Sequence, residues 1–470
     1  MAFMLIGSFV LFLLLFLLIG VASAAKSRGS TSDYLVAERS IAPWLTALSA
    51  VATNNSGYMF IGMIGLTYKI GFSSIWLMVG WITGDLIASL LCLKSIREKA
   101  EQTNSRSLGS LLGRWQGHDY LRVRRLAGVL TLIFLSGYAA AQFKAGGKTL
   151  QSLFDWNPVA GILIGGVIVL AYSLSGGIRA SIWTDAAQSA VMLVGMALML
   201  VAGLNQFDGG WSEANSLLQQ VSPTFMDWFS EPGLGKAALF VAGWFFGGVA
   251  VIGQPHIISR FLALRSAKDL PKMRVYYYSW FTIFYGLTIA VGLLCRLLLP
   301  PSSGFDAEMA LPMIAIQLLP DVGVGLILAA IFAATMSTAD SLILGCTASF
   351  TEDFSSTSDG SLGRTKTVTA LVMLGAVVIA LWDNQSVFGL VLMAWGLLAA
   401  AFTPLLLLLS AKRKLSEAKS LATMLTGVGV FFLWRITGLS ADIYEVAPAI
   451  LAGLVLGGSL SLGAMRPQKA

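Results

Sequence analysis

The sequence predicts an all-α integral membrane protein with thirteen transmembrane helices. Of its 470 residues, 56% are hydrophobic and only 12% are charged, and the mean hydropathy is +0.77. Soluble domains carry about twice that share of charged residues. Apolar stretches close to the roughly 20 residues that a helix needs to cross a bilayer recur along the whole chain. Basic residues gather in alternate connecting loops, and this third observation fixes the orientation.

The first helix is predicted at residues 1–24. No charge precedes its apolar run, and Lys26 and Arg28 follow it. A signal peptide carries its positive charge in front of the apolar run. We therefore predict a spanning helix whose amino end lies outside the cell and whose basic end lies in the cytoplasm.

Hydropathy predicts twelve further spans. One apolar segment, 311–348, is too long for a single straight crossing. Part of it, after Pro312 or before Pro320, is expected to run along the outer surface. The spans are residues 44–68, 74–93, 126–150, 158–174, 181–204, 236–258, 276–299, 311–348, 367–382, 386–410, 421–438 and 447–465.

Loop charges orient these spans. Lys and Arg outnumber acidic residues by eight to three in 94–125, by five to one in 259–275 and by four to one in 411–419. These loops are predicted to be cytoplasmic. The net charge of +7 follows from them and requires no nucleic acid. The loops 205–235 and 300–310 contain no base and are predicted to lie outside; the first holds Asp208, Glu213, Asp227 and Glu231.

Helix breakers within two spans indicate where a solute binds. The span 44–68 is interrupted by the polar run 53–57, and the span 236–258 by Gly243, Gly247, Gly248 and 253–255. Irregular backbone at membrane depth persists only where it is buried in protein or lines a cavity, and paired broken helices indicate a transporter site.

The two breaks lie in the first and sixth spans after the leading helix, which predicts two inverted repeats of five helices. These are residues 44–204 and 236–410. The rest of the chain divides into a leading helix with a cytoplasmic loop (1–43), an extracellular loop (205–235) and two additional C-terminal helices (411–470).

A polar cluster occupies the otherwise apolar segment 329–341. It includes Ser337, Thr338, Asp340 and Ser341. A charge at mid-membrane costs from about 3 to above 10 kcal/mol, so such clusters usually mark an ion or solute path. The alternative is two helices joined by hydroxyl hydrogen bonds worth about 0.6 kcal/mol each.

A series of short motifs recurs in order along nearly the whole chain. They are residues 32–40, 52–57, 175–180, 183–188, 253–256, 336–338 and 351–353. In these motifs the chain resembles the sodium:solute symporter family, and within it the bacterial sodium/proline symporters.

This resemblance implies a leucine-transporter-type fold in a bacterial inner (plasma) membrane. It also implies a secondary active transporter that couples sodium entry to solute uptake by alternating access. The implied sodium ligands are backbone carbonyls of the first core helix together with a carbonyl and two hydroxyls of the eighth. Sodium prefers oxygen ligands, and an unwound helix frees carbonyls that a regular helix would use internally. The ligands are Ala52, Asn55, Ala334, Ser337 and Thr338.

Some relatives bind a second sodium, which implies a possible second site here. Two carboxylates in one desolvated place favour a cation between them. In the alternative interpretation Asp185 bonds a neighbouring helix and Asp340 faces the inner vestibule. The residues of the possible site are Asp185, Ser337, Asp340 and Ser341.

Proline is the first predicted substrate, or else another small zwitterion or carboxylate. The sodium/proline symporters have aspartate where this chain has Asn54, and an apolar residue where it has Asn55. A different organic acid or a hydroxylated solute therefore stays open. The predicted substrate residues are Asn54, Ser56, Gly57, Tyr138, Gln142 and Trp244.

Other classes of protein are disfavoured. The spans offer no nucleophile with a base and no metal-ligand set, so an enzyme is not expected, and the clustered polar residues do not form a channel's continuous pore. A membrane sensor built on the same fold is the remaining alternative. Sodium, the solute and the bilayer are the expected partners, with no organic cofactor and no obligate protein partner.

Overall fold

The computed structural model describes residues 2–154, 156–229, 234–301, 305–354, 361–382, 387–441 and 443–462. All regular elements assigned within these ranges are helices, which confirms the all-α class. Nine helical stretches of the described residues are long and apolar enough to cross a membrane. Glu231, the first residue of the predicted span 386–410 and the last three residues of 447–465 lie outside the described residues.

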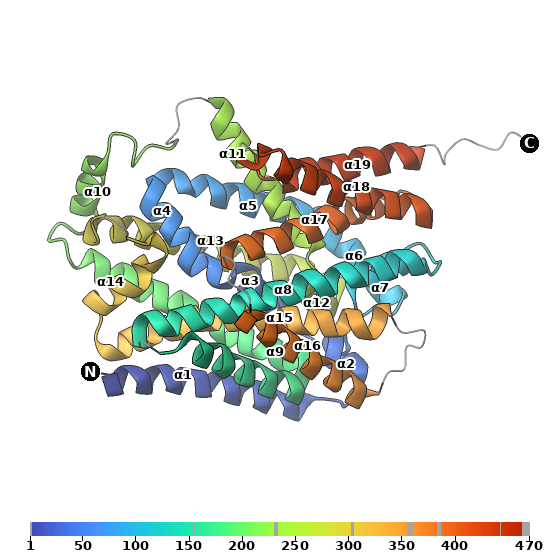
Figure 1. Ribbon diagram of the computed structural model, residues 1–470, viewed down its shortest axis with the longest axis horizontal. Helices are drawn as coiled ribbons and strands as arrows, with labels where there is room; N and C mark the ends of the chain where they lie inside the picture. Colours follow the sequence, from blue (N-terminus) through green and yellow to red (C-terminus); the bar gives the residue numbers. More distant parts are fainter. Residues whose placement is uncertain are drawn as a thin grey trace, which may run out of the picture.

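The helices, in chain order, are α1 (Ala2–Ser23), α2 (Thr31–Val36), α3 (Pro43–Tyr58), α4 (Ile64–Ile70), α5 (Ile75–Ala88), α6 (Lys94–Gln102), α7 (Leu108–Arg114), α8 (Leu121–Phe154), α9 (Pro158–Leu204), α10 (Gly210–Val221), α11 (Leu234–Val249), α12 (Pro255–Ala263), α13 (Leu270–Leu298), α14 (Ala310–Leu318), α15 (Asp321–Asp353), α16 (Leu362–Trp382), α17 (Val387–Ser410), α18 (Glu417–Ile436) and α19 (Val446–Leu462). Most of the long helices run roughly along one direction (Figure 1).

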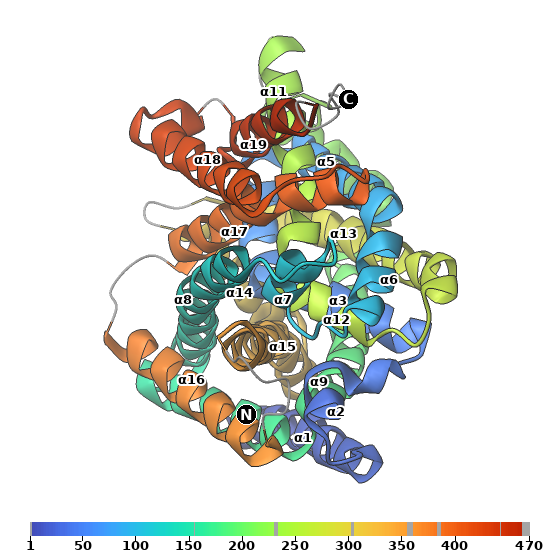
Figure 2. The same ribbon diagram turned by 90° about the vertical axis from the view of Figure 1, so that its right-hand side faces the viewer.

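Helix α15 forms the centre of the bundle, with α8, α9, α16 and α1 around it (Figure 2). Of the residues in the most apolar 18-residue stretch of α15, 89% are buried, whereas the corresponding share for α1 is 22%. Helix α1 instead exposes Leu11 and Leu18, each 65% accessible. The polar cluster at 337–341 therefore lies inside the protein, whereas α1 presents an apolar face suited to lipid.

Small residues allow α15 to be packed this closely. A Cβ atom at Gly325 would lie 2.0 Å from Ser8 Oγ of α1. Ala329, Ala330, Ala333 and Ala334 are almost completely buried. Interfaces between membrane helices are enriched in such residues because they let two backbones approach.

The predicted break in the first core span is present. Within α3, Ser56 adopts φ 35° and ψ −179°, and a π-helical turn at Met59–Met63 follows before α4. A positive φ is unfavourable for a residue with a Cβ and persists only when surrounding contacts enforce it. The polar run 53–57 is therefore folded around an irregular backbone next to α15.

The second predicted break is also present, but it is shorter than expected. Helix α11 continues to Val249, a 3-10 turn covers Ala250–Gly253, and Pro255 begins α12. The expected interruption at Gly243, Gly247 and Gly248 is wrong, because all three lie inside α11.

At least one of these glycines serves close packing instead. A Cβ at Gly248 would lie 2.0 Å from the carbonyl oxygen of Trp81, and a Cβ at Gly84 would lie 1.9 Å from that of Phe245. Paired glycines thus let α5 and α11 cross with their backbones nearly in contact.

Two further boundaries agree with the expectation. The predicted spans 158–174 and 181–204 correspond to two helical parts of α9, which meet at a kink where Gly177 departs from helical geometry (φ 55°, ψ −138°). A Cβ at that position would lie 2.5 Å from the carbonyl oxygen of Tyr34. The long segment 311–348 does divide before Pro320, into α14 and α15.

Candidate functional site

The break in α3 lies against the polar cluster of α15. The hydroxyl of Thr338 donates a hydrogen bond shared between two carbonyl oxygens, that of Thr53 in α3 at 3.3 Å and that of Ala334 at 3.1 Å. The Ser337 hydroxyl also donates to Ala334, at 3.2 Å. Ala52 and these α15 residues are all buried. Backbone and hydroxyl oxygens of both helices therefore converge where sodium ligands are predicted.

Thr53 joins the two helices more directly than the predicted Ala52 and Asn55. Besides the carbonyl contact with Thr338, its side chain shares a hydrogen bond of 2.8 Å with Ser341. The Asn55 amide nitrogen donates to Val51 of its own helix at 2.7 Å, and its Oδ1 atom has no hydrogen-bond partner among the described residues. The polar run 53–57 signalled Thr53, but the sequence did not indicate which member faces α15.

Asn54 takes part in a different network. Its Nδ2 atom donates to the Tyr277 hydroxyl of α13 at 2.8 Å, and that hydroxyl donates to Asp85 Oδ2 of α5 at 2.9 Å. All three side chains are buried. This chain of hydrogen bonds links α3 to α13 and α5. Sequence reasoning missed Asp85 and Tyr277, although a carboxylate inside an apolar span was a usable signal.

Four predicted substrate residues gather at the break itself. The side chains of Ser56 and Tyr138 are both buried at the break. A Cβ at Gly57 would lie 2.6 Å from Thr335 Cγ2 and 3.7 Å from Gln142 Oε1. Tyr138 and Gln142 are each only 2% exposed, and Gln142 Oε1 has no hydrogen-bond partner among the described residues. A buried acceptor without a donor costs about 1–3 kcal/mol, so it suits a ligand that brings a donor.

Trp244, the sixth predicted substrate residue, lies farther away. Its ring packs against Trp81 at 6.0 Å and Tyr444 at 5.5 Å between centroids. A series of ring contacts leads from it towards Tyr138, passing through Trp81, Trp395 and His256.

His256 is the ring that contacts Tyr138, with their centroids 5.8 Å apart. It is completely buried, and neither of its ring nitrogens has a hydrogen-bond partner in the described part of the chain. Sequence reasoning included His256 only within the motif 253–256 and gave it no role. Its position directly after Gln254-Pro255, at the second helix break, was the available signal.

Two of the predicted second-sodium residues, Asp185 and Ser341, come together around a positive charge. Arg260 lies 3.4 Å from Asp185 Oδ2, and both side chains are fully buried. The same guanidinium donates to Ser341 at 2.5 Å and to Ser181. Sequence reasoning missed this role because Arg260 was counted among the basic residues of a cytoplasmic loop.

The two carboxylates have further partners. Asp185 Oδ2 accepts from Ser49 of α3 at 2.6 Å, whereas Oδ1 has no hydrogen-bond partner in the described residues. Asp340 Oδ1 accepts from Ser173 at 2.5 Å. Burying a pair of carboxylates requires compensating charge and hydrogen bonds, and Arg260 with these hydroxyls supplies both.

Comparisons with known proteins agree on one family. The model of the sodium:solute symporter family matches residues 34–427. The chain is 30% identical to sodium/proline symporter 2 of Staphylococcus saprophyticus, with 95% of this chain and 90% of the relative covered. It is 29% identical to the high-affinity proline transporter PutP of Bacillus subtilis, with 95% and 96% covered.

Solved structures share the fold. A Na+-coupled sialic acid symporter superposes with a TM-score of 0.83 at 20% identity, with 98% of this chain and 97% of the other covered. MhsT in complex with L-phenylalanine gives 0.55 at 15% identity, with 89% and 97% covered.

Proposed function

Since the chain belongs to the sodium:solute symporter family, we propose that its sodium-coupled transport carries a small zwitterion or carboxylate into the cell, with proline as the first substrate to test. The family is one of transporters and not of enzymes. The apolar helices and the bacterial relatives support a multi-pass plasma-membrane protein.

One observation carries the sodium site: the Thr338 hydroxyl joins α15 to a backbone carbonyl beside the break in α3. A hydroxyl that already lies between two carbonyl oxygens can turn its oxygen towards a cation bound in the same place. Carbonyls near a helix break are free to accept such a cation. The proposed ligands are the predicted set, Ala52, Asn55, Ala334, Ser337 and Thr338, and we add the Thr53 carbonyl.

The proposed substrate position is the group formed by Ser56, Gly57, Tyr138 and Gln142. A broken helix presents backbone N–H groups and a positive dipole end to a carboxylate. The unpartnered Gln142 Oε1 atom offers an acceptor for the ammonium of a zwitterion, and the Tyr138 ring offers an apolar face. The relatives named for proline support proline as the first substrate to test.

Asn54 and Trp244 are not proposed to contact proline directly. Asn54 contacts Tyr277 at the break and acts on the substrate through the position of α3. Trp244 is separated from Tyr138 by other rings, so it would touch a solute larger than proline. A larger hydroxylated acid is accordingly the second candidate substrate.

The second sodium at Asp185, Ser337, Asp340 and Ser341 is a further part of the proposal. The partnerless Asp185 Oδ1 atom supports it. Arg260 opposes it, because the guanidinium at 3.4 Å competes with a cation for the same carboxylate. The measured number of sodium ions transported per solute decides whether a second sodium binds at Asp185 or Arg260 is its only cationic partner.

The proposed architecture has thirteen crossings, ten of them in two inverted repeats of five helices, and its amino end lies outside. The breaks at Ser56 and at 250–254 fall in the first helix of each proposed repeat. Helix α1 begins at the end of the bundle where α10 and α14 lie, and α19 ends near the opposite end (Figure 1). Chain ends on opposite sides support an odd number of crossings.

The decisive experiment is uptake into proteoliposomes that contain the purified chain. An imposed inward sodium gradient should drive accumulation of labelled proline, and replacing sodium by choline should abolish it. Equal uptake in both media would refute sodium coupling. A pH gradient alone, in the absence of sodium, tests a proton-driven relative.

Competition then separates the substrates. If excess proline leaves uptake of the identified substrate unchanged, proline is excluded, and full competition by a neutral sugar excludes the carboxylate. Solute binding without any sodium-dependent flux would favour the sensor alternative.

A further inference from the structure

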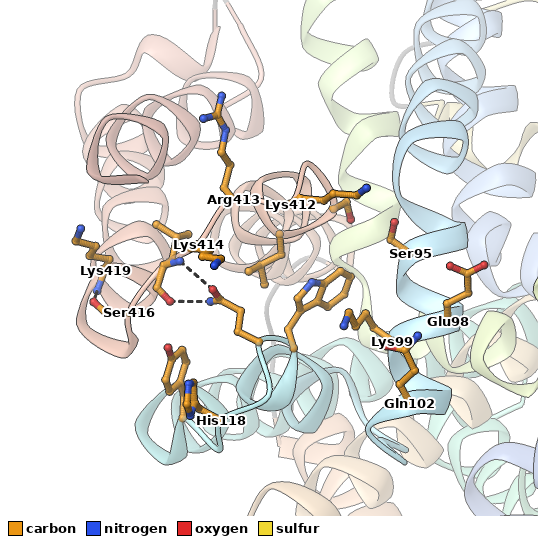
Figure 3. A pocket seen from close by; sticks show the side chains of 16 residues that line it. Ser95, Glu98, Lys99, Gln102, His118, Lys412, Arg413, Lys414, Ser416 and Lys419 are labelled. Carbon is orange, nitrogen blue, oxygen red and sulfur yellow. Dashed lines mark hydrogen bonds between the residues drawn. The ribbon is translucent and has the colours of Figure 1, made fainter. Parts of the chain in front are cut away.

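A basic cavity of about 710 Å³ lies away from the proposed transport site. It is bounded by three elements that are distant in sequence: α6, the connection from α7 to α8, and the connection from α17 to α18. Figure 3 shows Lys99 on one side of it, with Lys414 and Lys419 on the opposite side. Neither the sodium ligands nor the substrate residues contribute to its lining.

The cavity concentrates positive charge that the protein itself leaves uncompensated. Lys99, Lys412, Arg413, Lys414 and Lys419 line it, against the single carboxylate of Glu98. Among the described residues, none of Lys99, Lys412 or Lys414 forms an ion pair with a carboxylate. Like charges held around one cavity repel each other, and a bound anion relieves that repulsion.

Specific hydrogen bonds hold the walls of this cavity together, so it differs from a diffuse basic surface. The Gln116 side chain donates to the Leu415 carbonyl at 2.6 Å and accepts from the Leu415 N–H at 3.1 Å. This double hydrogen bond holds the lysine-bearing connection 411–416 against the connection from α7 to α8. Trp115, 5% exposed, forms a buried part of the wall.

The first turn of α18 adds a further attraction for an anion. Ser416 lines the cavity and is the N-cap of this 20-residue helix. The N-terminus of a helix carries partial positive charge and favours phosphate groups. The lysines and this helix end therefore act in the same direction.

The position of the cavity selects a lipid as the source of that anion. Leu90 and Leu91, 57% and 61% exposed, lie in the π-helical turn Ser89–Leu93 that leads into α6, whose Ser95 and Glu98 line the cavity. Leu409 and Ser410, the last residues of the membrane helix α17, line it as well. On the α6 side, the exposed leucines are thus followed about two turns later by the cavity-lining Lys99, the order expected where acyl chains give way to headgroups.

We propose that this cavity binds the phosphate-bearing headgroup of an anionic phospholipid from the leaflet at this end of the bundle. Basic pockets between membrane helices recognise such headgroups through their phosphates. A soluble organic phosphate offers the same group, but it brings no acyl chain to the apolar helix surface that continues from α6 at Leu90 and Leu91.

The test uses the full-length purified chain in mixed micelles. Phosphatidylglycerol or phosphatidylcholine is added, and native mass spectrometry measures retained lipid. Neutralising two cavity charges with Lys99→Gln and Lys414→Gln should weaken phosphatidylglycerol binding about tenfold. The double variant Lys99→Arg with Lys414→Arg keeps both charges and should retain binding.

Two controls separate a constructed site from a general charge effect. Arg364→Gln with Lys366→Gln removes two charges at the start of α16, outside the cavity, and should leave binding within about twofold of wild type. Gln116→Ala removes no charge but releases the connection 411–416, and it should also weaken binding.

Three results would overturn the proposal. Equal retention of phosphatidylglycerol and phosphatidylcholine would show that charge is not recognised. An equal loss in the Arg364/Lys366 control would show a diffuse surface effect. Full displacement of the lipid by an equal concentration of glycerol phosphate would show that the cavity takes soluble phosphates instead.

Discussion

Replacing Thr338 by alanine tests the sodium site most directly. The change deletes the hydroxyl that lies 3.3 Å from the Thr53 carbonyl oxygen and 3.1 Å from that of Ala334. It removes one of the six proposed cation ligands. We expect the sodium concentration for half-maximal uptake to rise more than about tenfold, which corresponds to more than about 1.4 kcal/mol.

The loss of a hydroxyl can also act through stability, so the size of that effect matters. A neutral hydrogen bond contributes about 0.5–1.5 kcal/mol, and the bond to Ala334 lies within one helix. Thr347→Ala serves as the matched control. It deletes a buried α15 hydroxyl that donates to Ile343 at 2.9 Å, away from the break in α3. Thr338→Ser keeps the hydroxyl and should keep sodium affinity.

The assay is initial proline uptake into proteoliposomes across a series of sodium concentrations, normalised to reconstituted protein. If Thr338→Ala and Thr347→Ala shift the sodium dependence equally, the hydroxyl has no special role at the break. If Thr338→Ala leaves that dependence within twofold of wild type, the proposed site is wrong.

Three further predictions follow from topology, the acidic pair and the helix break. A cysteine at Ser212 should react with an impermeant thiol reagent added outside intact cells, and one at Ser266 should react only after permeabilisation. The three natural cysteines are buried and should contribute little background labelling. The reverse pattern would show that the proposed topology is inverted. Asp185→Asn should lower the sodium Hill coefficient from near two towards one, whereas a wild-type coefficient of one leaves Asp185 as the partner of Arg260. Gly57→Ala should reduce uptake about tenfold, because its Cβ would lie 2.6 Å from Thr335 Cγ2 and overpacking costs about 1–3 kcal/mol. Thr335→Ser removes that methyl and should restore uptake; no restoration would contradict the steric explanation.

The sequence by itself determined the class of the molecule and two of the places where its helices break. Apolar length is a local property, so hydropathy indicated the apolar helices, nine of which in the described part of the chain are long enough to cross a membrane. The polar run 53–57 and Pro255 are equally local, and the structure has irregular backbone at Ser56 and immediately before Pro255. Motif order was sufficient to identify the family that the comparisons confirm.

Only the tertiary structure decided which polar side chains meet. Periodicity places Asn54 and Thr53 on different faces of α3, but not opposite particular helices. Packing directs Asn54 to Tyr277 and Thr53 to α15. It also brings Arg260, distant in sequence from Asp185, within 3.4 Å of that carboxylate. A buried charge has to find a partner wherever the folded chain supplies one, and that partner depends on the crossing of whole helices, which no local pattern encodes.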